Sequence, residues 1–131
     1  IPDKAYEFKK LVNESIGIII SLAEHNGSYT SAFKNIYDWI SVIETRVWGN
    51  KPLILLSTSD GQNAGKTVLQ TALSRFSRQS KEEIPHFSLP NFNENFSDTD
   101  GIINKKLSEQ LDKQISIFSR QVDNLLDSSN N

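Results

Sequence analysis

Two short apolar runs are the clearest features of the hydrophobic pattern. Residues 16–22 are rich in Ile, and residues 53–56 repeat the same signature directly after Pro52. A continuous apolar run of strand length is typical of a strand covered on both faces. Both runs are therefore predicted to be buried, parallel strands, with residues 16–22 central in the sheet. A weaker strand is predicted for residues 84–89.

Elsewhere the apolar residues recur every three or four positions, which is the spacing of one face of a helix. Asp98 or Asp100 is expected to cap the last of these helices, because a carboxylate near a helix start accepts from free amides. The helices are predicted over residues 2–13, 32–43, 68–76 and 103–125.

The alternation of helix and strand predicts an α/β domain with a parallel sheet and right-handed crossovers. One domain is expected over residues 1–126, followed by a disordered tail at residues 127–131, which are mostly Ser and Asn. Residues 90–101 have no sustained period and predict a long connection, which Phe92 and Phe96 can hold in place.

Two polar corners follow the two strongest strands, at residues 23–28 and 57–65. The carboxyl ends of parallel strands meet at one edge of a sheet, where flat cofactors bind, so the corners are expected to lie together. Gly27, Gly61 and Gly65 allow backbone to approach a planar ring closely. Transfer of a hydride to a bound planar ring needs stacking and alignment and no acid, base or nucleophile from the protein. No catalytic side chain is therefore predicted.

Composition narrows the class of protein. The 131 residues carry a formal net charge of -2 with scattered Lys and Arg, which argues against nucleic-acid binding through phosphates. Without Cys there is no disulfide or thiolate metal site, which suits the cytoplasm. The longest apolar run, residues 16–22, is shorter than the roughly 20 residues that cross a bilayer, so no membrane association is expected.

Several motifs resemble one family. Residues 24–28 read Glu-His-Asn-Gly-Ser, and residues 33–39 read Phe-Lys-Asn-Ile-Tyr-Asp-Trp. Lys51-Pro52 then precedes the second strand, and residues 57–61 read Ser-Thr-Ser-Asp-Gly. In order and spacing this resembles the NAD(P)H-dependent FMN reductases of flavodoxin-like fold.

The resemblance implies a flavodoxin-like three-layer sandwich with FMN and NAD(P)H as cofactors. Hydride would pass from NAD(P)H to bound FMN and then to a flavin, quinone or azo acceptor. A homodimer or homotetramer is implied, with Tyr29, Tyr37 and Trp48 as candidate contacts. The implied cofactor-binding residues are Glu24, His25, Asn26, Gly27, Ser28, Ser57, Thr58, Ser59, Asp60, Gly61, Gln62 and Gly65.

The start of the family pattern is not found upstream of Ile1. The family begins with a strand, a loop that holds the FMN phosphate, a helix and a second strand, so the chain is expected to be truncated at its amino terminus. In the strand order 2-1-3-4-5 the first strand would lie beside residues 16–22. Its absence would leave an apolar, unpaired edge, to be covered by a companion segment or a swapped strand.

The chain departs from the family at five positions in the two corners. Ala23 stands where Pro is usual, and His25 stands where Tyr is usual, which reduces the aromatic face beside the flavin. Asp60 replaces a common Pro and would oppose negative charge on reduced flavin unless it points away. Asn63 and Ala64 replace an Arg and a Gly, which leaves the nucleotide preference open.

Two alternatives from other classes stay open. Residues 61–67 end like a phosphate-binding P-loop, but they have three residues between the two Gly where that motif needs four. A flavodoxin-like fragment that binds no cofactor and only assembles with another chain is the second alternative. Metal chemistry is not predicted, since His25 and His86 are distant in sequence and have no carboxylate cluster.

Overall fold

Three parallel strands form the centre of the protein. In the computed structural model, which describes residues 1–130, these strands are β1 (Ile18–Leu22), β4 (Leu53–Thr58) and β5 (His86–Leu89). They pair in the order β1-β4-β5, with Ile20 opposite Leu55. The parallel sheet predicted from the apolar runs is confirmed.

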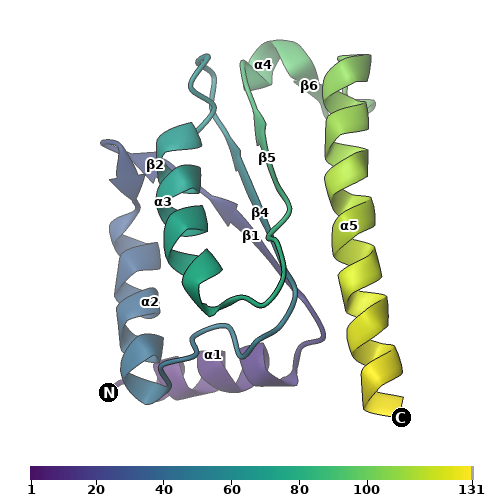
Figure 1. The fold of residues 1–131 in the computed structure, drawn as a ribbon. Coiled ribbons are helices and arrows are strands. Elements are labelled where there is room, and N and C mark those ends of the chain that lie inside the picture. The colour runs from purple at the N-terminus through teal and green to yellow at the C-terminus, as the bar shows by residue number, and fades with distance from the viewer. Residues whose placement is uncertain (131) are drawn as a thin grey trace.

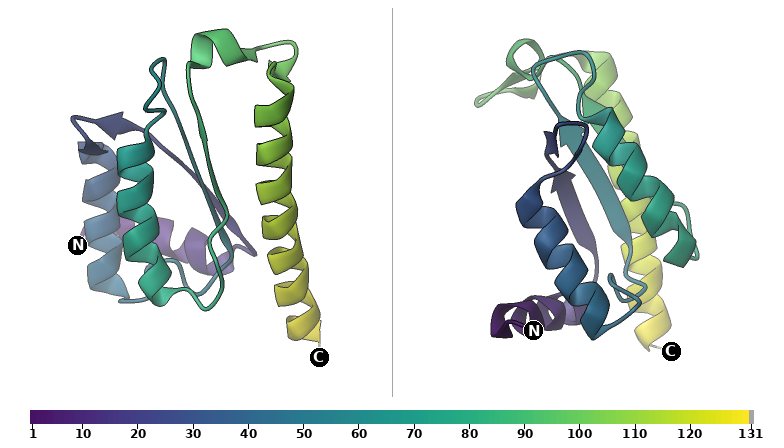
Figure 2. Two further views of the ribbon diagram at one scale, coloured as in Figure 1. Left: turned by 45° about the horizontal axis from the view of Figure 1, so that its top comes forward. Right: turned by 90° about the vertical axis from the view of Figure 1, so that its left-hand side faces the viewer.

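Helices cover the sheet on both faces, which confirms the three-layer arrangement. α2 (Ser31–Ile43) and α3 (Lys66–Phe76) lie on one face, and α5 (Lys105–Asn130) lies on the other (Figure 1). The two further views show the same layers, with the sheet between α2 and α5 (Figure 2). α1 (Asp3–Glu14) crosses the amino-terminal end of the sheet.

The remaining elements are short. They are β2 (Glu24–His25), β3 (Ser28–Tyr29), the 3-10 helix η1 (Ser77–Gln79), α4 (Phe92–Asn95), β6 (Phe96–Ser97) and β7 (Gly101–Ile102). β2 pairs with β3 and β6 pairs with β7, each pair antiparallel. The rings of Phe92 and Phe96 stack on each other within the predicted long connection, with centroids 4.9 Å apart. Backbone hydrogen bonds from Asn91 to Gly61 and from Phe92 to Ser59 join this connection to the loop after β4.

The core lies between the sheet and the layer of α2 and α3. Alternate β1 residues face it because successive strand side chains point to opposite sides, which places Ile20 and Leu22 against Leu55 and Ile40. Trp48 is only 7% exposed and packs on Phe76, with ring centroids 5.3 Å apart. Trp48 is therefore buried within the chain and is not available as the predicted subunit contact.

β1 differs from the prediction of a central strand covered on both faces. Among residues 1–130 it is an edge strand, and no strand pairs with its outer side. Ile19 points away from the core and is 65% exposed, because α5 packs over β4 and β5 instead. The predicted apolar, unpaired edge is thus present in the described part of the chain.

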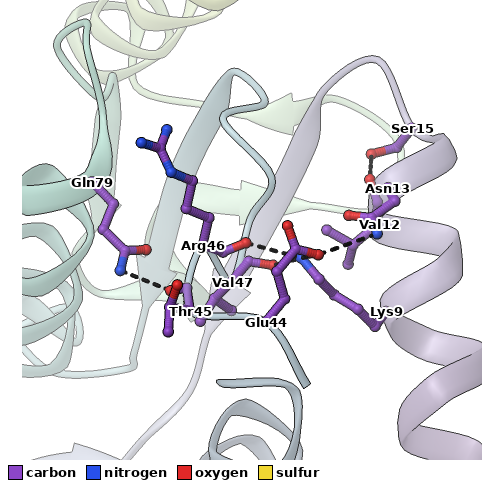
Figure 3. Close-up of polar contacts among 9 residues, drawn as sticks. All are labelled: Lys9, Val12, Asn13, Ser15, Glu44, Thr45, Arg46, Val47 and Gln79. Carbon is purple, nitrogen blue, oxygen red and sulfur yellow. Dashed lines mark hydrogen bonds and ion pairs between the residues drawn. The ribbon is translucent and has the colours of Figure 1, made fainter. Parts of the chain in front are cut away.

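A buried Lys attaches α1 to the loop after α2. The Lys9 ammonium donates to the carbonyl oxygens of Arg46 at 2.9 Å and Val47 at 2.7 Å, and it lies 3.3 Å from Glu44 Oε2 (Figure 3). Its side chain is 3% exposed. Buried ammonium groups are tolerated when their protons are paired, so this arrangement fixes the position of α1.

The last helix differs from its prediction at both ends. Asn104 caps the helix, because its Oδ1 accepts from the Leu107 amide at 3.0 Å. The predicted caps, Asp98 and Asp100, do not have this role. The helix also continues through residues 127–130, where a disordered tail was expected. Residue 131 lies outside the described residues. None of the helices within residues 1–130 combines the length and apolar character that crossing a membrane requires.

Candidate functional site

Three loops meet at the carboxyl-terminal edge of the sheet, at the top of Figure 1. The β2-β3 hairpin follows β1, residues 59–65 follow β4, and residues 90–91 lead from β5 into α4. Ligands in open α/β sheets bind at this edge, because strand ends and helix starts there present free backbone groups. The three loops therefore define the candidate site.

The first corner forms a tight hairpin. Asn26 and Gly27 both have positive φ, of 53° and 76°, which is the conformation of a two-residue turn with the hand of the flanking strands. His25 pairs with Ser28 across the turn. A side chain at Gly27 would meet nothing within 4 Å, so the turn explains this Gly without a ligand. All four residues are exposed at the tip.

Glu24 joins the first corner to the second. Its Oε1 accepts from the Val68 amide at 2.7 Å, and its Oε2 accepts from Asn63 Nδ2 at 3.1 Å. Val68 is in the first turn of α3, whose N-cap residue Gly65 has no side chain to accept from that turn. Glu24 therefore acts as the cap of α3 from another loop, and its charge favours the positive helix end.

The predicted proximity of the two corners is confirmed by these contacts. They also change the interpretation of Glu24, since both oxygens of its carboxylate bind protein groups. Its structural effect is to set the distance between the hairpin and the loop after β4. A separation of 44 positions between Glu24 and Val68 explains why the sequence does not reveal this contact.

The base of the second corner is packed against β4. Ser57 is 3% exposed, and its Oγ donates to the Ala64 carbonyl at 2.7 Å and lies 2.9 Å from Ser88 Oγ. Gly65 has φ of 71°, and a Cβ there would lie 2.9 Å from the Ser57 Cβ. Gly65 is thus required by this close approach, and Ser57 uses its hydroxyl inside the protein.

The upper part of the second corner is open. Thr58 Oγ1 donates to the Leu89 carbonyl at 2.7 Å, and the Gly61 amide donates to Ser59 Oγ at 3.3 Å. Asp60, Gly61 and Gln62 are exposed. Within residues 1–130, the amides of Gln62 and Asn63 take part in no hydrogen bond. These two amides are therefore free donors at the top of the loop.

A third segment, after β5, completes the edge and was not among the predicted site residues. The Asn91 amide donates to the Gly61 carbonyl at 3.0 Å, and the Phe92 amide donates to the Ser59 carbonyl at 2.9 Å. Asn91 has φ of 47°, a conformation that Asn tolerates better than most residues. The signal in the sequence was Pro90-Asn91 directly after a predicted parallel strand, the same position as the other two corners.

One titratable group beside the first corner has a shifted pKa. Burial is the main cause that raises the pKa of the Tyr29 phenol from 10.0 to about 12. Tyr37 contributes to the rise, and Arg75 opposes it. The phenol therefore remains protonated throughout the neutral range. The Tyr29 ring also packs on Phe33 in a tilted arrangement, with centroids 5.1 Å apart, and both rings pack against the core.

The arrangement is suited to binding a flat ligand. In the described part of the chain, no cluster of three or more His, Asp or Glu side chains can hold a metal ion. The edge instead offers exposed backbone, free amides and small residues, which suit a flat ligand with hydrogen-bonding edges. The candidate site, called the shelf below, consists of the hairpin tip (residues 25–28) and residues 60–63.

Comparison with known families agrees with this geometry. The sequence pattern of the NADPH-dependent FMN reductase family matches residues 1–103. That match includes the sheet and all three loops of the edge. The chain therefore belongs to the NADPH-dependent FMN reductase family.

A curated relative and two solved structures are similar to the chain. A 2-hydroxy-1,4-benzoquinone reductase from a Burkholderia species is 34% identical over 73 residues, which are 55% of this chain and 39% of that protein. The flavoenzyme FerB, an NAD(P)H:(acceptor) oxidoreductase from Paracoccus denitrificans, superimposes with a TM-score of 0.72 at 18% identity, over 94% of this chain and 69% of FerB. An oxidoreductase from Corynebacterium diphtheriae superimposes with a TM-score of 0.62 at 19% identity, over 95% of this chain and 62% of that protein.

These similarities have different weight. The two structural likenesses, at 18% and 19% identity, show the fold. The chain spans 39% of the length of the curated relative. The family match supports the reductase interpretation, and none of the similarities supports the P-loop alternative for residues 61–67.

Proposed function

We propose that the protein is an NAD(P)H-dependent FMN reductase that binds the flavin ring on the shelf at the carboxyl-terminal edge. The observation that carries the proposal is the pair of Glu24 hydrogen bonds, to Val68 at 2.7 Å and Asn63 at 3.1 Å, which hold the two corners side by side. Membership of the family supports the choice of FMN and NAD(P)H as cofactors.

The exposed backbone of the second corner fits the polar edge of a flavin. The pyrimidine edge needs hydrogen-bond donors, and the amides of Gln62 and Asn63 are free to donate. Gly61 keeps the surface low, because it has no side chain above the loop. His25 and Asn26, at the exposed hairpin tip, would flank the other end of the ring.

The protein residues would orient the ring and limit access of water to it. FMN, when bound, supplies the chemistry by accepting hydride from NAD(P)H and passing electrons to an acceptor. Exposed Lys66, in the first turn of α3, would place a positive charge near the polar edge, since the Glu24 carboxylate already caps that helix start. Exposed Asp60 opposes this effect, so we propose that its carboxylate points away from the ring.

The acceptor is proposed to be a quinone, with flavins and azo compounds as alternatives. The name of the Burkholderia relative, a benzoquinone reductase, supports the quinone. A homodimer or homotetramer in the cytoplasm is proposed from the family resemblance. Tyr29 and Tyr37, both half-buried, are the remaining candidate contacts after the burial of Trp48.

Anaerobic flavin reduction tests the proposal. The protein is titrated with FMN, NADPH is added without oxygen, and the visible flavin absorbance is followed. We expect saturable binding, loss of absorbance on addition of NADPH and its recovery on addition of benzoquinone. Free FMN without protein is the control, because NADPH reduces it slowly.

Three other outcomes would contradict the proposal. Tight binding of ATP with magnesium and no binding of FMN would favour the P-loop alternative. Binding of neither ligand would favour the fragment that only assembles with another chain. Binding of FMN without reduction by NADPH would leave a flavin-binding protein that is not a reductase.

A further inference from the structure

Asn26 and Gly27 form the exposed tip of the β2-β3 hairpin, beside the label β2 in Figure 1. An Asn side chain that precedes Gly is chemically labile, because the backbone nitrogen of the Gly can attack the carbonyl carbon of that side chain. Gly favours this attack since it has no Cβ beside the nitrogen. Whether the attack takes place in a folded protein depends on the freedom of the two groups that react.

Both reacting groups are free at the hairpin tip. Over residues 1–130, the Asn26 side chain takes part in no hydrogen bond, and the Gly27 amide donates to no acceptor. A Cβ on Gly27 would meet no heavy atom within 4 Å, so the space around the nitrogen is open. The two residues also lie between the pairs of the ladder, the nearest of which joins His25 to Ser28. The attack can therefore proceed without first breaking a hydrogen bond of either group.

Asn50 has the same backbone conformation but different surroundings. It is exposed and has φ of 59°, close to the 53° of Asn26. The amide that follows it, from Lys51, donates to the Trp48 carbonyl at 3.1 Å. The nitrogen that would attack is therefore occupied, and a Lys side chain stands beside it.

The second corner of the shelf is protected in the same way. Asn63 Nδ2 donates to Glu24 Oε2 at 3.1 Å, which holds that side chain in place. The Gly61 amide, which follows Asp60, donates to Ser59 Oγ at 3.3 Å. Among these three exposed positions and the hairpin tip, the tip alone combines a free Asn side chain with a free Gly amide.

We propose that Asn26 is a site of spontaneous modification, at which Asn is converted to Asp and isoaspartate. The Gly27 nitrogen bonds to Asn26 Cγ and loses its proton, the Cγ–Nδ2 bond breaks, and the Nδ2 group leaves as ammonia. Water then opens the succinimide ring on either side of the Gly27 nitrogen. Opening at Cγ gives Asp, and opening at the backbone carbonyl gives isoaspartate, in which the chain continues through Cγ.

Either product changes the shelf. Both add a negative charge at the hairpin tip, and isoaspartate also adds one carbon to the backbone of a two-residue turn. The longer backbone should disturb the pairing of His25 with Ser28. We therefore expect the modified protein to bind FMN more weakly. This effect rests on the proposed function, whereas the modification itself does not.

Peptide mapping by mass spectrometry tests the proposal. The protein is incubated at neutral pH and physiological temperature and then digested, and the peptides that contain Asn26 and Asn50 are compared. The Asn26 peptide should gain the mass difference between a hydroxyl and an amino group and separate into Asp and isoaspartate forms. An isoaspartate methyltransferase should label the second form. The Asn50 peptide should stay unchanged while most of the Asn26 peptide converts.

Two variants separate the contribution of the sequence from that of the structure. Gly27→Ala should slow conversion of Asn26 by about tenfold, because a Cβ restricts rotation around the attacking nitrogen. Lys51→Gly gives Asn50 the same following residue and a similar φ, but that amide still donates to Trp48. Its Asn50 should convert about tenfold more slowly than Asn26, which is the effect of about one hydrogen bond.

Three results would overturn the proposal. An intact Asn26 peptide from the folded protein, when the same peptide has converted in urea, would mean that the hairpin protects this site. Equal rates at Asn26 and at Asn50 of Lys51→Gly would mean that freedom of the amide makes no difference. Conversion to Asp without isoaspartate would exclude the succinimide.

FMN titration of the modified protein tests the consequence separately. Weaker binding than that of freshly prepared protein would support the effect on the shelf. Unchanged binding, after peptide mapping has shown the modification, would contradict the position of Asn26 beside the flavin and leave the chemistry at Asn26 established.

Discussion

Gly27 and Gly65 both have positive φ, of 76° and 71°, but for different reasons. Gly27 is at the tip of an open turn, whereas Gly65 faces Ser57 so closely that a Cβ would approach to 2.9 Å. At both positions an L side chain strains the backbone, and only at Gly65 does it also clash with β4. The shape of the second corner therefore depends on Gly65 more than the hairpin depends on Gly27.

The two Ala substitutions should separate these effects. Gly27→Ala is expected to lower the free energy of unfolding by about 1 kcal/mol from backbone strain alone. Gly65→Ala should lower it by about 2–4 kcal/mol, because overpacking against Ser57 adds to the strain. Urea unfolding measures both. Equal losses would contradict the close approach of Gly65 to β4.

Tyr29 gives the protein a predicted dependence on alkaline pH. The pKa of its phenol is raised from 10.0 to about 12, mainly by burial and to a smaller extent by Tyr37. Because the folded-state pKa is raised, the stabilisation is complete below pH 10 and is lost as the pH rises through about 12. In Tyr29→Phe the unfolding free energy should fall less over this pH window. An unchanged pH profile in urea unfolding would refute the assignment.

Lys9 contributes the buried polar contacts that attach α1 to the rest of the protein, beside the apolar packing of Ala5 and Val12. The Lys9 ammonium satisfies the carbonyl oxygens of Arg46 and Val47, in the loop between α2 and β4. Helices of this length gain most of their stability from tertiary contacts. Loss of the Lys9 contacts should therefore weaken the attachment of α1 to that loop, which Asn13 and Val12 also support.

Substitution of Lys9 tests this dependence. Lys9→Met keeps the length of the side chain but leaves the buried Val47 carbonyl without this partner, whereas the Arg46 carbonyl still accepts from the Gly49 amide at 3.0 Å. The free energy of unfolding should therefore fall by about 1–3 kcal/mol. Lys4→Met, which removes an exposed pair to Glu7, should change it by less than about 0.5 kcal/mol. Similar values for both variants in urea unfolding would show that α1 does not need the Lys9 contacts.

At the scale of the whole molecule, Glu24 connects the layer of α3 to the hairpin that follows β1. The two hydrogen bonds of its carboxylate hold the two halves of the shelf side by side. The geometry of the shelf and the stability of the helix start therefore depend on the same side chain. If Glu24 positions the shelf, its loss lowers both the stability of the protein and FMN binding. Direct contact with the cofactor alone would affect only binding.

Glu24→Ala should affect both properties. The free energy of unfolding should fall by about 1–3 kcal/mol, because the first turn of α3 loses its cap. FMN binding should weaken as well, since the hairpin is no longer fixed. Glu24→Gln, which can still accept from Val68, should recover part of both. Asp38→Ala, which removes an exposed pair on α2, serves as the control and should change neither.

Local signals predicted much of this architecture. The apolar runs predicted the parallel sheet. The β2-β3 hairpin was not predicted, although the Asn26-Gly27 pair is a known sign of a tight turn. Contacts between distant segments were not predictable from such patterns. The cap supplied by Glu24, the burial of Trp48 and the approach of Asn91 to Gly61 each depend on the tertiary arrangement. The edge position of β1 was not predictable either, because it depends on which strands pair with β1. The residues of β1 themselves are typical of a central strand.

The central claim is that a flavin ring binds across the two corners joined by Glu24. The most direct measurement is a map of backbone amide shifts during titration with FMN. We predict saturable shifts concentrated in residues 24–28 and 59–65, with the amides of Gln62 and Asn63 among the largest. Shifts confined to one corner, or located instead at the amino-terminal edge around residues 48–52, would contradict the account.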